Sequence, residues 1–240
     1  MDVYQQIGVI YYTDDQLGDP ILGVVQKRII ASGLPIVSCS LNEPIDFGEN
    51  YVIDGERSWG TMARQIIVAL EHSVAKYVFF CESDVLYHPS HFDFTPPRDD
   101  TYYYNINNWR WRFGTDTAIT YDRLMSLSGL CCNRELALKH FESRIEKAIS
   151  RGYDLSASTE PIWARKWGYE PGTKVRRRGG FNNEPYDVWS SEFPNIDIRH
   201  NKTLSVLKTT QKEFRHIPTG WKEINVDDIR GWNVRRLFQL

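Results

Sequence analysis

The first eighty residues alternate between two kinds of hydrophobic periodicity. Residues 7–12, 34–39 and 76–81 are short apolar runs, the pattern of strands that are buried on both faces. Between them, residues 18–32 and 58–74 carry apolar side chains at helical spacing. This order of strands and helices predicts an α/β fold with a mostly parallel sheet flanked by helices, whose ligand site lies beyond the carboxyl ends of the strands.

The second half of the chain has a different pattern. Residues 101–111 and 117–121 are rich in Tyr and Trp and predict strands with aromatic faces. Residues 133–150 have the spacing of a helix, and residues 168–195 carry Gly, Pro, Asn and Arg without periodicity, which indicates a long functional loop. We expect a single domain over residues 1–240 with an aromatic-rich second half.

Composition narrows the range of partners. The formal net charge of -2 provides no general attraction to nucleic acid or to an anionic membrane, so such a partner would need a local basic patch. The four cysteines have neither a disulfide framework nor the spacing of a metal knuckle, and are expected to be reduced thiols. No apolar run approaches the roughly 18 residues that span a bilayer, and no N-terminal signal region is recognisable, so we expect a cytoplasmic enzyme.

The strongest local signal is an acidic group at the end of an apolar run. Residues 77–81 lead directly into Glu82, Ser83 and Asp84. Alternate residues of an extended chain point the same way, so the two carboxylates can share one ligand. Hard oxygen ligands suit Mn²⁺ or Mg²⁺ bridging phosphates. The alternative is an acidic turn that is merely solvated.

In this context the Glu82-Ser83-Asp84 segment resembles the D-x-D-type motif of GT-A glycosyltransferases, which binds a divalent cation and the donor diphosphate. Upstream, Ser58-Trp59-Gly60 opens a helix that contains Arg64 and Gln65, which is similar to the family 2 arrangement in which this helix lies beside the nucleotide. The run that ends in Tyr12-Thr13-Asp14-Asp15 matches the position where these enzymes hold the base and ribose of the donor.

The resemblance implies a GT-A (Rossmann-like) fold that uses a nucleotide-sugar donor. Residues 1–97 would form the nucleotide-sugar-binding half and residues 98–240 the acceptor-binding and catalytic half. The implied nucleotide-sugar contacts are Thr13, Asp14, Asp15, Arg64, Glu82 and Ser83.

Two later segments extend the resemblance. Residues 158–169 resemble the segment that supplies the catalytic carboxylate of inverting members, which makes Glu160 the candidate base for the acceptor hydroxyl. The family usually shows two adjacent acids there, and this chain has Thr159 before Glu160. The alternative is a helix start, with Thr159 as its cap and Pro161 in its first turn.

The segment Asp197-Ile198-Arg199-His200 is similar to a D-I-R-H segment found late in some GT-A proteins. The resemblance makes His200 a third metal ligand beside Glu82 and Asp84, and a neutral imidazole is chemically suited to Mn²⁺. The alternative is an ordinary histidine that is exposed or hydrogen-bonded within the fold.

Two further groups of residues are candidates for ligand contacts. A basic loop that closes over the diphosphate is expected at Lys174, Arg176, Arg177 and Arg178, with a solvated loop or a contact to a nucleic-acid backbone as alternatives. Acceptor platforms are expected among Trp109, Trp111, Trp163 and Trp189, each of which could instead be a core residue.

Together these features predict a metal-dependent glycosyltransferase that moves a sugar from a nucleotide diphosphate donor to a hydroxyl acceptor. The acceptor could be a glycan, a small molecule or a hydroxylated DNA base. The alternatives are a sugar nucleotidyltransferase, which usually has an early Gly-rich loop absent from residues 8–18, and a noncatalytic carbohydrate-binding or nucleic-acid-binding module.

Overall fold

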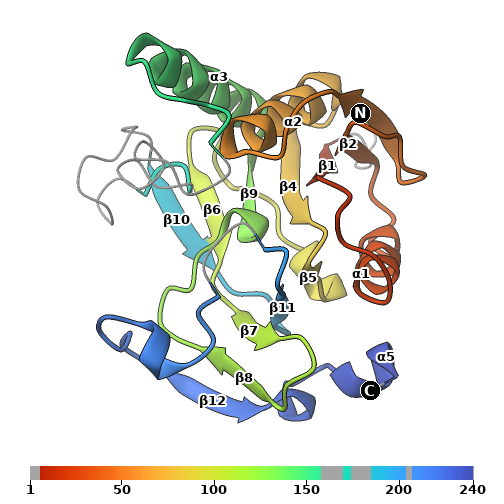
Figure 1. The fold of residues 1–240 in the computed structure, drawn as a ribbon, viewed down its shortest axis with the longest axis vertical. Helices are drawn as coiled ribbons and strands as arrows, with labels where there is room; N and C mark the ends of the chain where they lie inside the picture. The colour runs from red at the N-terminus through yellow and green to blue at the C-terminus, as the bar shows by residue number, and fades with distance from the viewer. Residues whose placement is uncertain (1–5, 158–169, 174–184, 204–206, 240) are drawn as a thin grey trace.

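The computed structural model describes residues 6–157, 170–173, 185–203 and 207–239, which form two β-sheets and the helices around them (Figure 1). The larger sheet has the strand order β10-β6-β9-β4-β1-β2-β3. Its strands are β1 (Ile7–Thr13), β2 (Ile36–Leu41), β3 (Glu49–Ile53), β4 (Tyr77–Glu82), β6 (Tyr102–Asn105), β9 (Leu130–Asn133) and β10 (Tyr186–Trp189). Neighbouring strands are parallel except where β9 pairs with β4 and β6. The predicted mostly parallel sheet is confirmed.

Helices cover both faces of this sheet. They are α1 (Ile21–Ile30), α2 (Trp59–His72) and α3 (Arg134–Ser150), whereas α5 (Val234–Phe238) packs near α1 and against Trp111. Ile10 and Phe80 face α2 and α3 in one hydrophobic core, while the alternate residues Val9 and Phe79 belong to a second core with α1. Burial on both faces explains why β1 and β4 are continuous apolar runs. The predicted α/β class, with helices flanking the sheet, is therefore confirmed.

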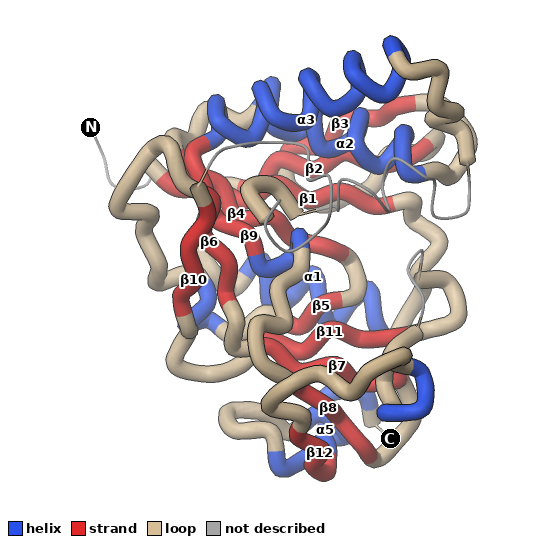
Figure 2. Tube along the Cα trace, turned by 90° about the vertical axis from the view of Figure 1, so that its left-hand side faces the viewer, coloured by secondary structure: helices blue, strands red, loops and turns tan. Residues whose placement is uncertain are grey.

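A second, five-stranded sheet lies beyond the α1 side of the first (Figure 2). Its order is β12-β8-β7-β11-β5, with β5 (Val85–Leu86), β7 (Asn108–Arg112), β8 (Thr117–Thr120), β11 (Asn195–Arg199) and β12 (Lys222–Asn225). Trp111 and Ile198 of this sheet pack into the core that contains Val9 and Phe79. This core therefore joins the two sheets.

The structure corrects two sequence predictions about the second half. The aromatic stretch 101–111 is not one strand, because β6 ends at Asn105 in the first sheet and β7 begins at Asn108 in the second. The predicted loop 168–195 contains β10, which pairs with β6. From the second half of the chain, β6, β9 and β10 complete the sheet begun by β1 to β4.

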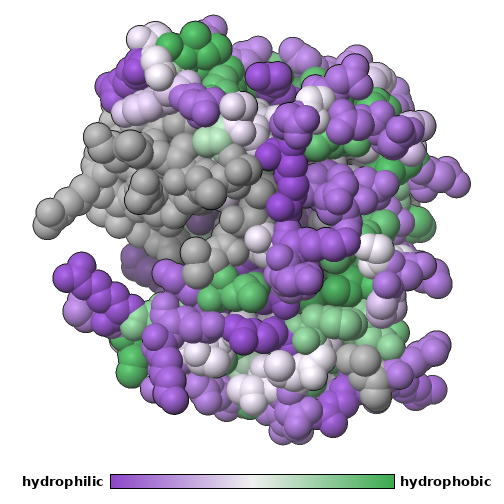
Figure 3. Space-filling view, in the orientation of Figure 1, coloured by the Kyte–Doolittle hydropathy of each residue, from purple (hydrophilic) through white to green (hydrophobic). Residues whose placement is uncertain are grey.

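The surface facing the viewer in Figure 3 is mainly hydrophilic, with hydrophobic residues scattered among the polar ones. Within the described residues, no helix combines the length and the apolar character needed to cross a membrane.

A buried polar junction holds the two sheets together near His91, which is fully buried. The Nδ1 atom of His91 accepts hydrogen bonds from the side-chain amides of Asn105, at the end of β6, and Asn195, at the start of β11, both at 3.0 Å. The ring also stacks on Trp189 of β10. Burial lowers the pKa of His91 to about 3, so the imidazole is neutral in the folded protein.

We expect His91 to make the folded protein sensitive to acid. The unfolded chain binds a proton at His91 near its ordinary pKa of 6.5, whereas the folded chain does not until about pH 3. Stability contributed by neutral His91 is therefore present above pH 6.5 and is lost as the pH falls, by about 1.4 kcal/mol per pH unit at most. Denaturant unfolding of His91→Gln should show a stability deficit at pH 7 that narrows toward pH 4. A deficit that is constant across this range would contradict the assignment.

Close backbone contact fixes the start of α2. Ser58 caps the helix by accepting a hydrogen bond from the Thr61 N–H at 3.0 Å. The Ser58 hydroxyl and the Gly60 N–H both donate to the Leu155 carbonyl, at 2.8 and 3.2 Å. A Cβ atom on Gly60 would lie 2.4 Å from that carbonyl oxygen. Glycine at position 60 therefore allows the helix start to dock on the segment after α3.

Gly60→Ala should destabilise the protein by about 1–3 kcal/mol, because the added methyl group must push apart two backbone segments. Chemical denaturation at pH 7 measures the change. Gly18→Ala is the matched control, since a Cβ atom there meets nothing within 4 Å. Equal stability of the two variants would show that the contact between Gly60 and Leu155 is not restrictive.

Candidate functional site

A pocket opens where the carboxyl ends of β1, β2 and β4 meet the start of α2 and the end of β11. This is the edge at which a parallel sheet places its ligand site. The lining residues are Tyr12, Thr13, Asp14, Leu17, Leu41, Arg57, Ser58, Trp59, Thr61, Met62, Gln65, Glu82, Ser83, Asp84, Arg199, His200, Lys202 and Thr203.

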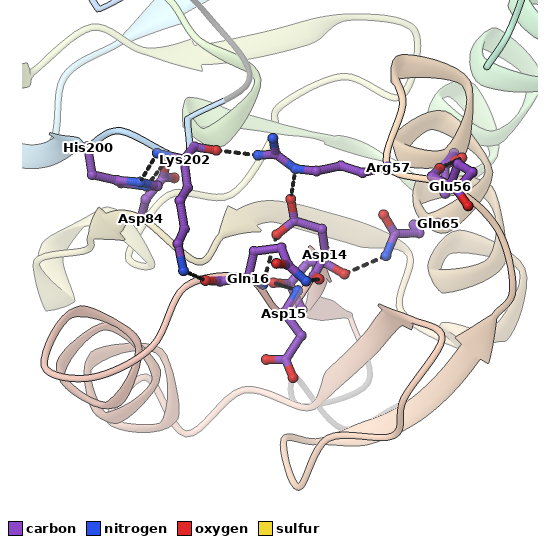
Figure 4. Close-up of polar contacts among 11 residues, drawn as sticks. Asp14, Asp15, Gln16, Glu56, Arg57, Gln65, Asp84, His200 and Lys202 are labelled. Atoms are coloured by element: carbon purple, nitrogen blue, oxygen red, sulfur yellow. Dashed lines mark hydrogen bonds and ion pairs between the residues drawn. The ribbon is translucent and has the colours of Figure 1, made fainter. Parts of the chain in front are cut away.

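Asp84 and His200, 116 residues apart in the sequence, meet in this pocket (Figure 4). The Ile198 N–H of β11 donates to the Asp84 carbonyl at 2.8 Å, which fixes the end of β11 beside the turn after β4. His200 follows directly, and its Nε2 atom lies 3.3 Å from Asp84 Oδ2. Their side chains are only 11% and 16% exposed. The structure thus brings together two of the three residues expected to bind a metal.

The hydrogen bonds of His200 determine its tautomer. Its Nδ1 atom accepts from the Lys202 backbone N–H at 3.2 Å. In the neutral ring the proton therefore resides on Nε2, which donates to Asp84. In this arrangement the imidazole links the turn after β4 to the loop after β11.

Glu82 is engaged differently. It ends β4, and its Oε1 atom accepts a hydrogen bond from the Tyr12 hydroxyl at 2.6 Å. Burial and the nearby negative charge of Asp84 raise the pKa of Glu82 to about 8. Among the described residues, no three His, Cys, Asp or Glu side chains are grouped so that they could hold a metal ion. The expected three-residue set of Glu82, Asp84 and His200 is therefore not assembled in this arrangement.

Two cationic side chains at the pocket connect three loops (Figure 4). Arg57, which precedes α2, forms an ion pair with Asp14 after β1 and donates to the Lys202 carbonyl after β11. The Lys202 ammonium group in turn donates to the Gln16 carbonyl. Sequence reasoning missed Arg57 and Lys202, because neither lies in a motif with a recognisable spacing. Their contacts hold the loop that carries His200 beside the loop after β1.

The remaining expected nucleotide contacts divide into two groups. Thr13 and Asp14 line the pocket, and the Thr13 carbonyl accepts from the Gln65 side chain at 2.6 Å. Asp15 is exposed, and Figure 4 shows its carboxylate directed away from Asp84 and His200. Arg64 is exposed on α2 and is not a lining residue, whereas its neighbour Gln65 is buried and lines the pocket. Successive residues of a helix point in directions about 100° apart, which explains this difference.

Three of the four expected acceptor platforms are described, and they lie away from the pocket wall. Trp111 is fully buried and packs near Phe113 and Phe238, so its ring is inaccessible to an acceptor. Trp109 and Trp189 are half-buried against the same core. Both indoles belong to packing: Trp109 extends from β7 and Trp189 from β10 against this core, and Trp189 also stacks on Phe94. The other expected residues lie outside the described part of the chain, namely Trp163, Glu160, Lys174, Arg176, Arg177 and Arg178.

Comparison with known proteins yields structural similarity at low sequence identity. No protein-family model and no curated protein matches the chain. Among solved structures, it is similar to a glycosyltransferase involved in the glycosylation of the major capsid of PBCV-1, with 10% identity and a TM-score of 0.42 over 77% of this chain and 82% of that chain. It is also similar to the apo-form glycosyltransferase GlyE of Streptococcus pneumoniae TIGR4, with 12% identity and a TM-score of 0.33 over 60% of this chain and 39% of that chain. At these identities and TM-scores the two structures carry no argument about the fold, donor, acceptor or reaction of this chain.

Proposed function

We propose that this chain is a metal-dependent glycosyltransferase of the GT-A type, which moves a sugar from a nucleotide diphosphate donor to a hydroxyl acceptor. The observation that carries the proposal is the meeting of Asp84 and His200 in a pocket at the carboxyl ends of parallel strands. Such pockets are where α/β sheets bind nucleotides. The acidic and cationic residues that line it match the parts of a nucleotide sugar bound with a divalent ion.

The two ends of the pocket differ in chemistry. Leu17, Leu41, Trp59 and Met62 supply apolar surface beside the buried amide of Gln65. Apolar side chains with a few fixed polar groups suit a nucleoside. The acidic end, at Asp84 and His200, then faces the diphosphate.

The distance between Asp84 and His200 suits a shared cation, Mn²⁺ or Mg²⁺. Two adjacent ligands of an octahedral ion, each about 2.1 Å from it, lie about 3 Å apart. The observed separation of Asp84 Oδ2 and His200 Nε2 is 3.3 Å. Such ions are commonly bound by one or two protein ligands together with substrate phosphates, so an incomplete protein set suffices. When bound, the cation would neutralise charge on the diphosphate.

Ligation by His200 would involve its neighbours. A metal binds the lone pair of a ring nitrogen, so the proton now on Nε2 would move to Nδ1. Nδ1 could then no longer accept from the Lys202 N–H. We infer that cation binding and the position of the loop after β11 are coupled. A cation beside Asp84 would also favour the ionised form of Glu82, which the Tyr12 hydroxyl stabilises by donating its hydrogen bond.

Cationic side chains of the pocket would act on the same charge. Arg57 and Lys202 both line the pocket. A guanidinium group forms paired hydrogen bonds with phosphate oxygens. In the absence of donor, Asp14 neutralises Arg57. Donor binding would redirect Arg57 from Asp14 to the diphosphate, where it stabilises the charge that grows as the glycosidic bond breaks. Glu160 stays the proposed base for the acceptor hydroxyl, and the acceptor stays a glycan, a small molecule or a hydroxylated DNA base.

Wild-type protein with Mn²⁺ should release nucleoside diphosphate from one member of a nucleotide-sugar panel, and chelation should stop the release. Asp84→Asn should lower turnover by about 100-fold or more, because it removes a charged group at the reacting diphosphate. Asp15→Asn, an exposed change on the loop after β1, is the control. Release of pyrophosphate from NTP and sugar phosphate would instead indicate a nucleotidyltransferase. Absence of both turnover and metal-dependent nucleotide binding would indicate a binding module.

Arg57→Gln should raise the donor KM by about tenfold and leave the nucleoside affinity unchanged, because the lost interaction is with the diphosphate. Steady-state kinetics and calorimetry measure the two quantities. Arg64→Gln is the matched control, since Arg64 is exposed on the adjoining helix and does not line the pocket. Equal effects of the two substitutions would assign donor binding to general surface charge.

A further inference from the structure

Three charged side chains form a chain across one face of the second sheet. β7 and β11 are parallel, with Asp197 directly opposite Arg110. One carboxylate oxygen of Asp197 lies 3.2 Å from Arg110 Nε, and the other lies 3.3 Å from Arg199 Nε. The alternate residues Ile196 and Ile198 point into the core on the opposite face. We refer to Arg110, Asp197 and Arg199 as the arginine chain.

The arginine chain is largely withdrawn from solvent. The side chains of Arg110, Asp197 and Arg199 are 12%, 14% and 9% exposed. Charges in such an environment are costly unless they are paired in good geometry. Two guanidinium groups and one carboxylate leave the three residues with one net positive charge. Arg199, one of the two arginines, lines the pocket together with Asp84 and His200.

Arg110, the member of the arginine chain that pairs with Asp197 from β7, makes further contacts that hold it in place. Arg110 donates to the Tyr121 hydroxyl at 3.1 Å, and its guanidinium group lies over the Tyr121 ring at 5.7 Å from the centroid. It is therefore held by Asp197 on one side and by Tyr121 on the other. Arg110 is not among the pocket-lining residues, whereas Arg199 is. Tyr121 contacts Arg110, Arg110 pairs with Asp197, and Asp197 pairs with Arg199, so each residue restrains the next.

We propose that Arg199 binds the anionic diphosphate of the donor and that Asp197 and Arg110 are positioning residues that hold its guanidinium group in place. This proposal rests on the function proposed above and extends it to a group from the second sheet. A long arginine side chain loses rotamer freedom when it binds a ligand, and an arginine already held by Asp197 loses less. A planar guanidinium fork matches the oxygens of a phosphate group.

The test compares binding of nucleoside diphosphates with binding of the corresponding nucleosides. Uridine and guanosine diphosphates with Mn²⁺ serve as probes in calorimetry. For the diphosphate that binds the wild-type protein, Arg199→Gln and Asp197→Asn should each raise the Kd by about tenfold. The affinity for the corresponding nucleoside should stay unchanged. In turnover, Asp197→Asn should raise the donor KM by a similar factor and change kcat less than about threefold. A merely structural role would lower kcat and nucleoside binding together.

Matched variants separate positioning from stability. Glu213→Gln breaks the ion pair of Glu213 with Arg112, which lies two residues beyond Arg110 on β7, and it should leave diphosphate binding unchanged. Tyr121→Phe removes only the hydroxyl that Arg110 contacts and should weaken diphosphate binding by about twofold without unfolding the protein. Arg110→Lys should retain more diphosphate affinity than Arg110→Gln, because it keeps the charge beside Asp197.

The outcomes distinguish this proposal from the one on which it rests. If wild type binds neither diphosphate and turns over no nucleotide sugar, both proposals are wrong. If wild type binds a diphosphate and Arg199→Gln binds it equally well, the role of Arg199 is wrong while the transferase function stands. If only Arg199→Gln is impaired, and Asp197→Asn and Tyr121→Phe are not, the positioning roles are wrong.

Discussion

The short pairing between β5 and β11 determines most of what is distinctive in this structure. β5 contains only Val85 and Leu86 and follows β4 after the turn at Ser83 and Asp84. The Ile198 N–H donates to the Asp84 carbonyl next to this pairing. The chain thereby passes from the first sheet to the second within a few residues of its acidic motif. Because the pairing has one register, it also determines where residue 200 must lie.

Charge in the pocket is balanced across loops that are distant in the sequence. Asp14 forms an ion pair with Arg57, Asp84 accepts a hydrogen bond from His200, and Glu82 accepts one from the Tyr12 hydroxyl. Each contact joins residues from different segments, so the pocket is organised by its own ion pairs and hydrogen bonds. A ligand with phosphates and a cation would exchange these contacts for its own, which links ligand binding to the positions of the loops. The buried junction at His91 connects the two sheets through Asn105 and Asn195.

The elements predicted from sequence are those in which local pattern and tertiary environment agree. The strands at 7–12, 34–39 and 76–81 lie within two residues of β1, β2 and β4, because continuous apolar runs are stable only where both faces are covered. The helices at 58–74 and 133–150 are confirmed as α2 and α3. By contrast, β3 was not predicted, since its edge position leaves half-exposed polar residues without a clear alternation. The second sheet was not predicted either, because its strands, apart from the neighbours β7 and β8, pair across long separations in the sequence.

The sequence by itself determined the α/β class and the edge of the sheet where acidic residues collect, whereas the meeting of positions 84 and 200 was expected only from the family resemblance. The class and the edge follow from hydrophobic period and from the strand ends, which are local properties. Only the tertiary structure decided that Trp111 is a core residue, that Gln65 rather than Arg64 faces the pocket, and that Arg57, Lys202 and Arg199 stand beside the acids. Which side chains share a cavity depends on how strands from distant segments pair and on the direction in which each backbone position points, and neither is encoded in spacing along the chain.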